Sequence, residues 1–272
     1  MTAEMEKLGI IAGNGKFPLI LAGNAKAEGL YVVVCALSEE ADPLIEELAD
    51  SVHWLSITQL GKLIKTFQKE GVTKAVMAGQ VMKRRMYTSD LLKLDLTAAR
   101  LWASLPDKKG ESILRAVADE LGKNGIELLD STLYMKPFLA EPGVMTKCKP
   151  TKHQAADVEF GLRMAKVVAE HDIGQSVAVK DLSVVAVEAV EGTDNCIRRA
   201  GELGKDGIVI VKVSKKDHDM RFDVPVVGMR TLEAMRDSRA SVLAIEAGKT
   251  LMLEKRELLA GADKAGICIM GI

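Results

Sequence analysis

The stretch Gly9-Ile-Ile-Ala-Gly-Asn-Gly-Lys-Phe-Pro18 has the pattern of a buried strand, a glycine turn and the start of a helix. Gly13 and Gly15 permit a tight turn, and Pro18 suits a first helical turn, where its missing N–H needs no partner. Backbone N–H groups at such a turn can approach an anion closely. However, the third glycine of a dinucleotide loop and the spacing of a Walker loop are both lacking. The stretch predicts a βα unit that binds an anion or nucleotide through Gly13, Gly15 and Lys16, or else a plain turn.

Short β-branched runs alternate with helical patterns through the rest of the first half. This alternation favours βαβ units and a mostly parallel sheet. We expect strands at 8–12, 31–37, 52–57, 74–79 and 126–131, and helices at 18–28, 42–48, 59–71, 89–104 and 111–124.

A stretch rich in proline and glycine, 137–150, interrupts this pattern and predicts a linker. After a helix at 151–170, the second half has more hairpin-like strands. We expect strands at 176–179, 183–190, 207–213, 241–246, 250–253 and 266–272, and helices at 193–203, 230–239 and 254–265. The predicted fold is α/β, with a nucleotide- or phosphate-binding N-terminal domain over 1–136 and a mixed-sheet α/β domain over 151–272.

Composition excludes several classes of function. The chain has 272 residues, 48% of them hydrophobic and 28% charged, and a net charge of −1, so we expect no nucleic-acid partner. Its four cysteines and four histidines show no metal-ligand spacing, and Cys35 and Cys268 lie in apolar runs that suit the core of a protein in a reducing cytoplasm. No apolar run is typical of a signal peptide or a membrane span, so any membrane contact is expected to be peripheral.

Basic and acidic residues are concentrated in the stretch Lys212-Val-Ser-Lys-Lys-Asp-His-Asp-Met-Arg-Phe-Asp-Val-Pro225. Asp219, Arg221 and Asp223 alternate in it, so an extended chain would point all three side chains to one face. Two carboxylates beside a guanidinium can hold a divalent cation and a phosphate. A solvated polar edge strand is the alternative interpretation.

Two further segments follow expected strands. Ala78-Gly79-Gln80 ends the fourth strand, and the carboxyl ends of parallel strands form the ligand crevice, so this loop and 13–16 could line one cleft. Glu188-Ala-Val-Glu-Gly-Thr-Asp194 precedes a helix that Thr193 or Asp194 is expected to cap. Capping does not account for the three acidic residues together, which could include a metal ligand.

Eight segments in this order resemble those of one family, and together they span nearly the whole chain. They are 8–15 with Pro18, 78–81, 109–115, 150–154, 172–175, 188–194, 221–225 with Gly228, and 246–248. They are similar to those of the LpxI-type UDP-2,3-diacylglucosamine pyrophosphatases of lipid A biosynthesis. The chain departs from the family pattern at Lys216 and His218, where many members have proline and glutamine.

The resemblance implies two α/β domains, the second of them catalytic, with the lipid-bearing sugar nucleotide held between them. It implies hydrolysis that depends on Mg²⁺ or Mn²⁺, in which water attacks the α-phosphorus to give UMP and 2,3-diacylglucosamine 1-phosphate (lipid X). It makes Asp223 the catalytic residue. The expected substrate-binding residues are Gly13, Gly15, Lys16, Ala78, Gly79, Gln80, Gln175, Thr193, Lys212 and Arg221. The candidate metal ligands are Asp223, Asp194 and Glu191.

On this interpretation the protein is a cytoplasmic enzyme that lies peripherally on the inner membrane, and a homodimer is one candidate oligomeric state. Two alternatives stay open: a diphosphatase acting on a soluble nucleotide-sugar, and a nucleotide-binding regulatory protein without turnover.

Overall fold

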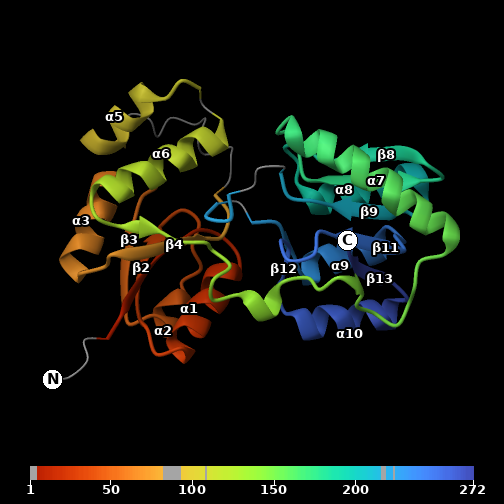
Figure 1. The fold of residues 1–272 in the computed structure, drawn as a ribbon, viewed down its shortest axis with the longest axis horizontal. Helices are drawn as coiled ribbons and strands as arrows, with labels where there is room; N and C mark the ends of the chain where they lie inside the picture. Colours follow the sequence, from red (N-terminus) through yellow and green to blue (C-terminus); the bar gives the residue numbers. More distant parts are fainter. Residues whose placement is uncertain (1–4, 82–92, 108, 216–218, 223) are drawn as a thin grey trace. The chain divides into compact units, whose positions relative to one another are not determined.

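The computed structural model describes residues 5–81, 93–107, 109–215, 219–222 and 224–272 (Figure 1). The described chain forms two compact units. The first contains the residues up to Met135 together with 219–222, and the second contains those from Lys136 to Lys215 and from Val224 to Ile272. The prediction of two α/β domains is confirmed, with a parallel sheet in the first and a mixed sheet in the second.

The first unit is built on five parallel strands in the order β3-β2-β1-β4-β5. The strands are β1 (Lys7–Ala12), β2 (Tyr31–Leu37), β3 (Ser51–Leu55), β4 (Lys74–Ala78) and β5 (Glu127–Leu128). The helices are α1 (Phe17–Ala27), α2 (Ile45–Leu48), α3 (Leu60–Glu70), α5 (Leu96–Ser104) and α6 (Gly110–Lys123). Successive strands extend to one side of β1 and then β4 returns to its other side, so the strand order reverses at the β1–β4 pair. Ligands of open parallel sheets bind beyond the carboxyl ends of the strands at such a reversal.

Alternate strand residues explain how this sheet is covered. Ile11, Val33 and Cys35 point to one face, where they form a buried core with apolar residues of α3, α5 and α6. Helices α1 and α2 contact each other on the opposite side of the sheet (Figure 1). Helix α3 ends at Gly71, whose φ of 73° is the left-handed conformation that glycine adopts without strain.

The second unit contains a six-stranded mixed sheet in the order β6-β13-β11-β9-β7-β8. Strands β9, β11 and β13 are parallel to one another. Strand β6 pairs antiparallel with β13, and β7 pairs antiparallel with both β8 and β9. The strands are β6 (Gly143–Val144), β7 (Ser176–Lys180), β8 (Ser183–Val187), β9 (Val209–Lys212), β11 (Val242–Ile245) and β13 (Cys268–Gly271), and β10 (Val226–Val227) pairs separately with β12 (Leu251–Met252). One face packs on α7 (Lys152–Glu170) and the other on α8 (Thr193–Gly204), α9 (Met229–Asp237) and α10 (Lys255–Ala265).

The segment 137–150 is more than a connection. It contains part of a 3-10 turn (Lys136–Phe138) and strand β6, which pairs with β13. Ala140 is 3% exposed and belongs to the apolar core of the second unit. The sequence-based description of 137–150 as a linker therefore differs from the structure, in which most of it is built into the second unit.

A short segment from late in the sequence completes the first unit. The Phe222 side chain is 4% exposed and lies in the core beneath α3, α5 and α6. The Ser131 N–H, just after β5, donates to the Met220 carbonyl at 2.9 Å. Residues 219–222 thus belong to the N-terminal unit, although the sequence-based boundaries assigned them to the C-terminal domain.

We predict that Phe222→Ala destabilises the N-terminal unit by about 3–5 kcal/mol, because it removes a buried aromatic ring and leaves a cavity. Both tryptophans, Trp54 and Trp102, lie in that unit, so tryptophan fluorescence during urea unfolding reports on it directly. Phe160→Ala, which removes a partly buried ring from α7 of the other unit, is the control. An unchanged tryptophan transition in Phe222→Ala would show that the ring does not support this core.

Candidate functional site

The loops after β1 and β4 are joined by backbone hydrogen bonds. The Gly13 N–H donates to the Ala78 carbonyl at 2.8 Å, while Asn14 and Gln80 exchange hydrogen bonds of 2.7 and 3.0 Å. The structure therefore brings together two loops that were expected to line one cleft, at the point where the strand order reverses.

The glycines of these loops have different roles. A Cβ on Gly13 would lie 2.6 Å from the Gln80 carbonyl oxygen, and one on Gly79 would lie 2.6 Å from that of Asn14, so both are needed for the close loop contact. Gly15 has a φ of +96°, and no atom lies within 4 Å of the place of a Cβ. Gly15 and Lys16 are exposed at the start of α1, whose N-terminus has no side-chain cap. The anion-binding potential of the loop therefore lies at Gly15 and Lys16.

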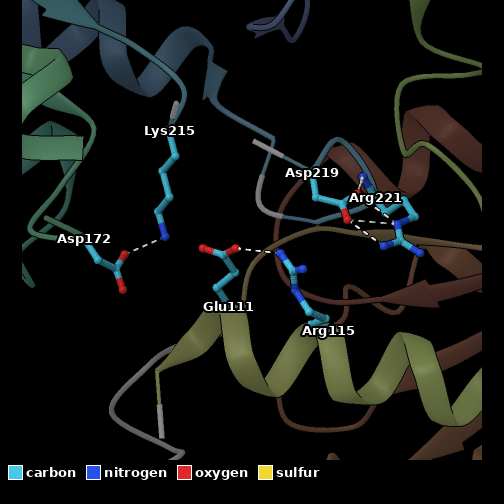
Figure 2. A network of polar contacts seen from close by, with 6 residues as sticks. All are labelled: Glu111, Arg115, Asp172, Lys215, Asp219 and Arg221. Carbon is cyan, nitrogen blue, oxygen red and sulfur yellow. Dashed lines mark hydrogen bonds and ion pairs between the residues drawn. The ribbon is translucent and has the colours of Figure 1, made fainter. Parts of the chain in front are cut away.

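The Asp219–Arg221 segment is a turn and not an extended strand (Figure 2). The Phe222 N–H donates to the Asp219 carbonyl at 2.9 Å, and the Asp219 carboxylate accepts from the backbone N–H of Arg221 at 3.1 Å. The expectation that alternating side chains share one face of an extended chain is therefore wrong for this pair. An aspartate that accepts the N–H two residues further on is a common turn-forming contact.

The carboxylate of Asp219 also holds the guanidinium of Arg221. Arg221 Nε donates to it at 2.9 and 3.1 Å, and Nη2 donates at 2.6 Å (Figure 2). These bonds lower the pKa of Asp219 and raise that of Arg221, so both groups are charged at neutral pH. Arg115 of α6, which pairs with Glu111 at 3.1 Å, further lowers the pKa of Asp219. Arg221, a predicted substrate-binding residue, thus belongs to a charged group in the N-terminal unit, whereas Asp223 lies outside the described residues, as do Lys216 and His218.

A second group of polar residues lies at one edge of the sheet of the C-terminal unit. Lys212, at the end of β9, is 5% exposed, and its Nζ donates to Thr193 Oγ1 at 2.8 Å. Thr193 in turn donates to Glu188 Oε1 at 3.0 Å, and Glu188 Oε2 lies 3.9 Å from Lys212 Nζ. Gln175 lies beside this group, with its carbonyl accepting the Val213 N–H at 2.9 Å.

The predicted cap of α8 is wrong. The N-cap position is occupied by Gly192, with a φ of 80°, and no side chain caps this helix. Thr193 is instead used for the contacts with Lys212 and Glu188. Cys196, one turn further along α8, is not a ready nucleophile, because burial and the nearby carboxylate of Glu188 raise the pKa of its thiol to about 12.

Glu246, at the end of β11, holds the chain where it leaves β9. Its Oε2 accepts from Lys166 Nζ at 2.8 Å, and from the N–H and hydroxyl of Ser214 at 2.9 and 2.7 Å. Its Oε1 accepts from Lys249 Nζ at 2.7 Å. Lys215, the residue after Ser214, pairs with Asp172 at 2.6 Å (Figure 2). Burial opposes ionisation of Glu246, but these donors lower its pKa to about 2.

The carboxylates of Glu191 and Asp194 do not fit a common metal site. Glu191 pairs with Arg199 at 2.6 Å, whereas Asp194 accepts from Thr231 at 3.3 Å and lies 3.5 Å from Arg230. Within the described part of the chain, no group of three His, Cys, Asp or Glu side chains is arranged to hold a metal ion. The roles of these residues and of Asp223 toward a metal stay predictions.

We predict that Glu246→Gln lowers the free energy of unfolding at pH 7 by about 2 kcal/mol, because it removes the negative charge that accepts from Lys166, Lys249 and Ser214. The ordinary pKa of 4.5 is lowered in the folded state, so the contribution of Glu246 is complete above about pH 4.5 and is lost as the pH falls toward 2. The difference between wild type and variant should therefore narrow from pH 7 to pH 3 in urea titrations. Exposed Glu233→Gln is the control; equal effects of the two substitutions would contradict this account.

Comparison with known proteins covers both units. Residues 7–138 match the family model of the LpxI N-terminal domain, and residues 141–270 match that of the LpxI C-terminal domain. The chain is 31% identical over 282 residues to the UDP-2,3-diacylglucosamine pyrophosphatase LpxI of Caulobacter vibrioides, and the alignment covers 98% of each protein.

Similarity to solved structures is much weaker. Phosphoribosylglycinamide synthetase from Anaerococcus prevotii is 13% identical with a TM-score of 0.25, over 71% of this chain and 34% of that one. The biotin carboxylase domain of Hydrogenobacter thermophilus 2-oxoglutarate carboxylase is 12% identical with a TM-score of 0.28, over 76% of this chain and 44% of that one. The present chain thus spans less than half of either protein, and TM-scores this low support no conclusion about fold or function.

Proposed function

Because this chain belongs to the LpxI family, we propose that it hydrolyses the diphosphate of UDP-2,3-diacylglucosamine. The single observation that carries this proposal is the alignment of the chain with 98% of a pyrophosphatase named for this substrate. The N-terminal site supports it, because two loops that end neighbouring parallel strands lie at the sheet reversal, where such folds bind ligands.

The proposed reaction is attack of water on the α-phosphorus. The water oxygen bonds to that phosphorus, the bond from it to the bridging oxygen breaks, and UMP and lipid X are released. Such a reaction needs neutralisation of phosphoryl charge and a positioned water, and no nucleophilic side chain. This agrees with the uncharged, buried thiol of Cys196.

We assign roles to residues of both units within this proposal. The exposed N-terminus of α1 at Gly15 and Lys16 would bind phosphate oxygens or the uridine part, next to the loop of Ala78, Gly79 and Gln80. Arg221 would add positive charge from its turn, and Asp223, two residues further on, would be the catalytic residue. In the other unit, Gln175, Thr193 and Lys212 would contact the substrate.

Dependence on Mg²⁺ or Mn²⁺ is also part of the proposal. A divalent cation would neutralise phosphoryl charge when bound. Glu191 and Asp194 have arginine partners that a cation would have to displace, and Asp223 stays the third candidate ligand.

The lipid part of the substrate would require access to a membrane. No helix within the described ranges is long and apolar enough to cross a bilayer. We propose a cytoplasmic protein in peripheral contact with the inner membrane, which acts as a monomer or homodimer.

The deciding experiment is UMP release from UDP-2,3-diacylglucosamine, with and without Mg²⁺ or Mn²⁺. We predict turnover that a chelator removes and added metal restores, and a loss of at least about 10²-fold in Asp223→Ala with unchanged circular dichroism. Near-normal activity in folded Asp223→Ala would remove this residue from the site. Equal turnover of UDP-N-acetylglucosamine would instead favour a soluble nucleotide-sugar as substrate, and no turnover of either would favour a regulatory protein.

We further predict that Gly15→Val raises KM by roughly tenfold, equivalent to about 1.4 kcal/mol of binding, because the added side chain blocks approach of a ligand to the backbone. Gly29→Val is a matched control, since Gly29 also has a positive φ of +85° and open space around it but follows the C-terminus of α1. Both variants should lose similar stability in thermal unfolding. A KM change shared by both would indicate that backbone strain is the cause, and an unchanged KM would make 13–16 a plain turn.

A further inference from the structure

Ser131 makes three contacts to two distant segments of the N-terminal unit. It follows β5 and is 1% exposed. Its hydroxyl oxygen lies 2.7 Å from the Met77 carbonyl oxygen and 3.0 Å from that of Arg221, and its N–H donates to the Met220 carbonyl at 2.9 Å. One hydroxyl hydrogen is thus shared between carbonyls 54 and 90 residues away in the sequence.

The two segments joined by Ser131 both carry residues of the proposed site. Met77 directly precedes Ala78, whose carbonyl accepts the N–H of Gly13 in the glycine loop. Arg221 presents its guanidinium from the turn held by Asp219. A continuous series of hydrogen bonds therefore runs from the glycine loop, through the end of β4 and Ser131, to the backbone of Arg221.

Other contacts would keep the turn in place without setting its position as closely. Phe222 inserts into the core, but apolar contacts are non-directional. They keep the ring buried, yet they allow small shifts of the backbone that carries it. The bonds between Asp219 and Arg221 lie within the turn and do not connect it to the sheet. The three directional contacts of Ser131 supply that connection.

We propose that Ser131 is a positioning residue for the hydrolytic reaction, which fixes the backbone of Arg221 relative to the Ala78-Gly79-Gln80 loop. This inference rests on the proposed function. Small displacements of charge-stabilising groups reduce stabilisation of the transition state more than they reduce binding of the substrate. Loss of the hydroxyl should therefore lower kcat more than it raises KM.

The neighbouring residue provides a matched control. Thr132 is 5% exposed, and its hydroxyl donates to Asp130 at 2.7 Å. The backbone N–H of Thr132 donates to the same carboxylate oxygen at 2.7 Å and is kept in Thr132→Val. This substitution therefore removes a buried hydroxyl one residue away, whose hydrogen bond goes to Asp130 and not to β4 or the turn.

The test compares Ser131→Ala with Thr132→Val in the UMP-release assay. We expect kcat to fall at least about tenfold in Ser131→Ala, with KM within about twofold, and both constants to stay within about twofold in Thr132→Val. Thermal unfolding of both variants shows whether they are equally folded. Equal kcat in the two variants, or an effect of Ser131→Ala confined to KM, would overturn the proposal.

Amide hydrogen exchange gives a second readout that needs no substrate. Exchange at 220–222 should accelerate in Ser131→Ala and not in Thr132→Val, because only the first loses a contact to this turn. Unchanged exchange would show that Ser131 does not hold the turn. If exchange accelerates while the wild-type protein releases no UMP, the structural link stands and the proposed function fails, and with it the role in the reaction.

Discussion

The N-terminal unit depends on burial of one short segment that the chain supplies late. Phe222 fills part of the core under α3, α5 and α6, and the turn that carries it is hydrogen-bonded to Ser131, three residues after the end of β5. Hydrophobic burial and directional bonds act together here, the first holding the ring and the second setting the backbone. Everything that Arg221 contributes to the site follows from this insertion.

Both units have charged groups near the carboxyl ends of parallel strands, but these groups differ in how far they are buried. In the N-terminal unit the charges lie in ion pairs that are partly exposed, such as Asp219 with Arg221. In the C-terminal unit the carboxylate of Glu246 is largely buried and is satisfied by four donors from Lys166, Ser214 and Lys249. A buried charge is tolerated only when it is paired in this way.

The elements of this fold could be predicted largely from sequence because their signals are local. Apolar periodicity, Gly71 after α3 and Thr151 before α7 each identify a strand or helix, a helix end or a helix start within a few residues. Contacts between distant residues have no such signal. Alternation at Asp219 and Arg221 is compatible with both a strand and a turn, and nothing around Ser131 distinguishes it from any serine after a strand. The wrong prediction that Thr193 caps α8 has the same origin. Gly192 and Thr193 are both good N-cap residues, and the contact of Thr193 with the buried Lys212 comes from a distant part of the sequence.

The insertion of 219–222 also bears on synthesis of the chain. A ribosome that has completed Met135 has made every strand and helix of the N-terminal unit, but Phe222 is still 87 residues from being added. At about 5–20 residues per second, the nascent unit waits roughly 4–17 s with an incomplete core, while most of the C-terminal sheet is being made. The core of the N-terminal unit can therefore be completed only after residue 222 has been translated.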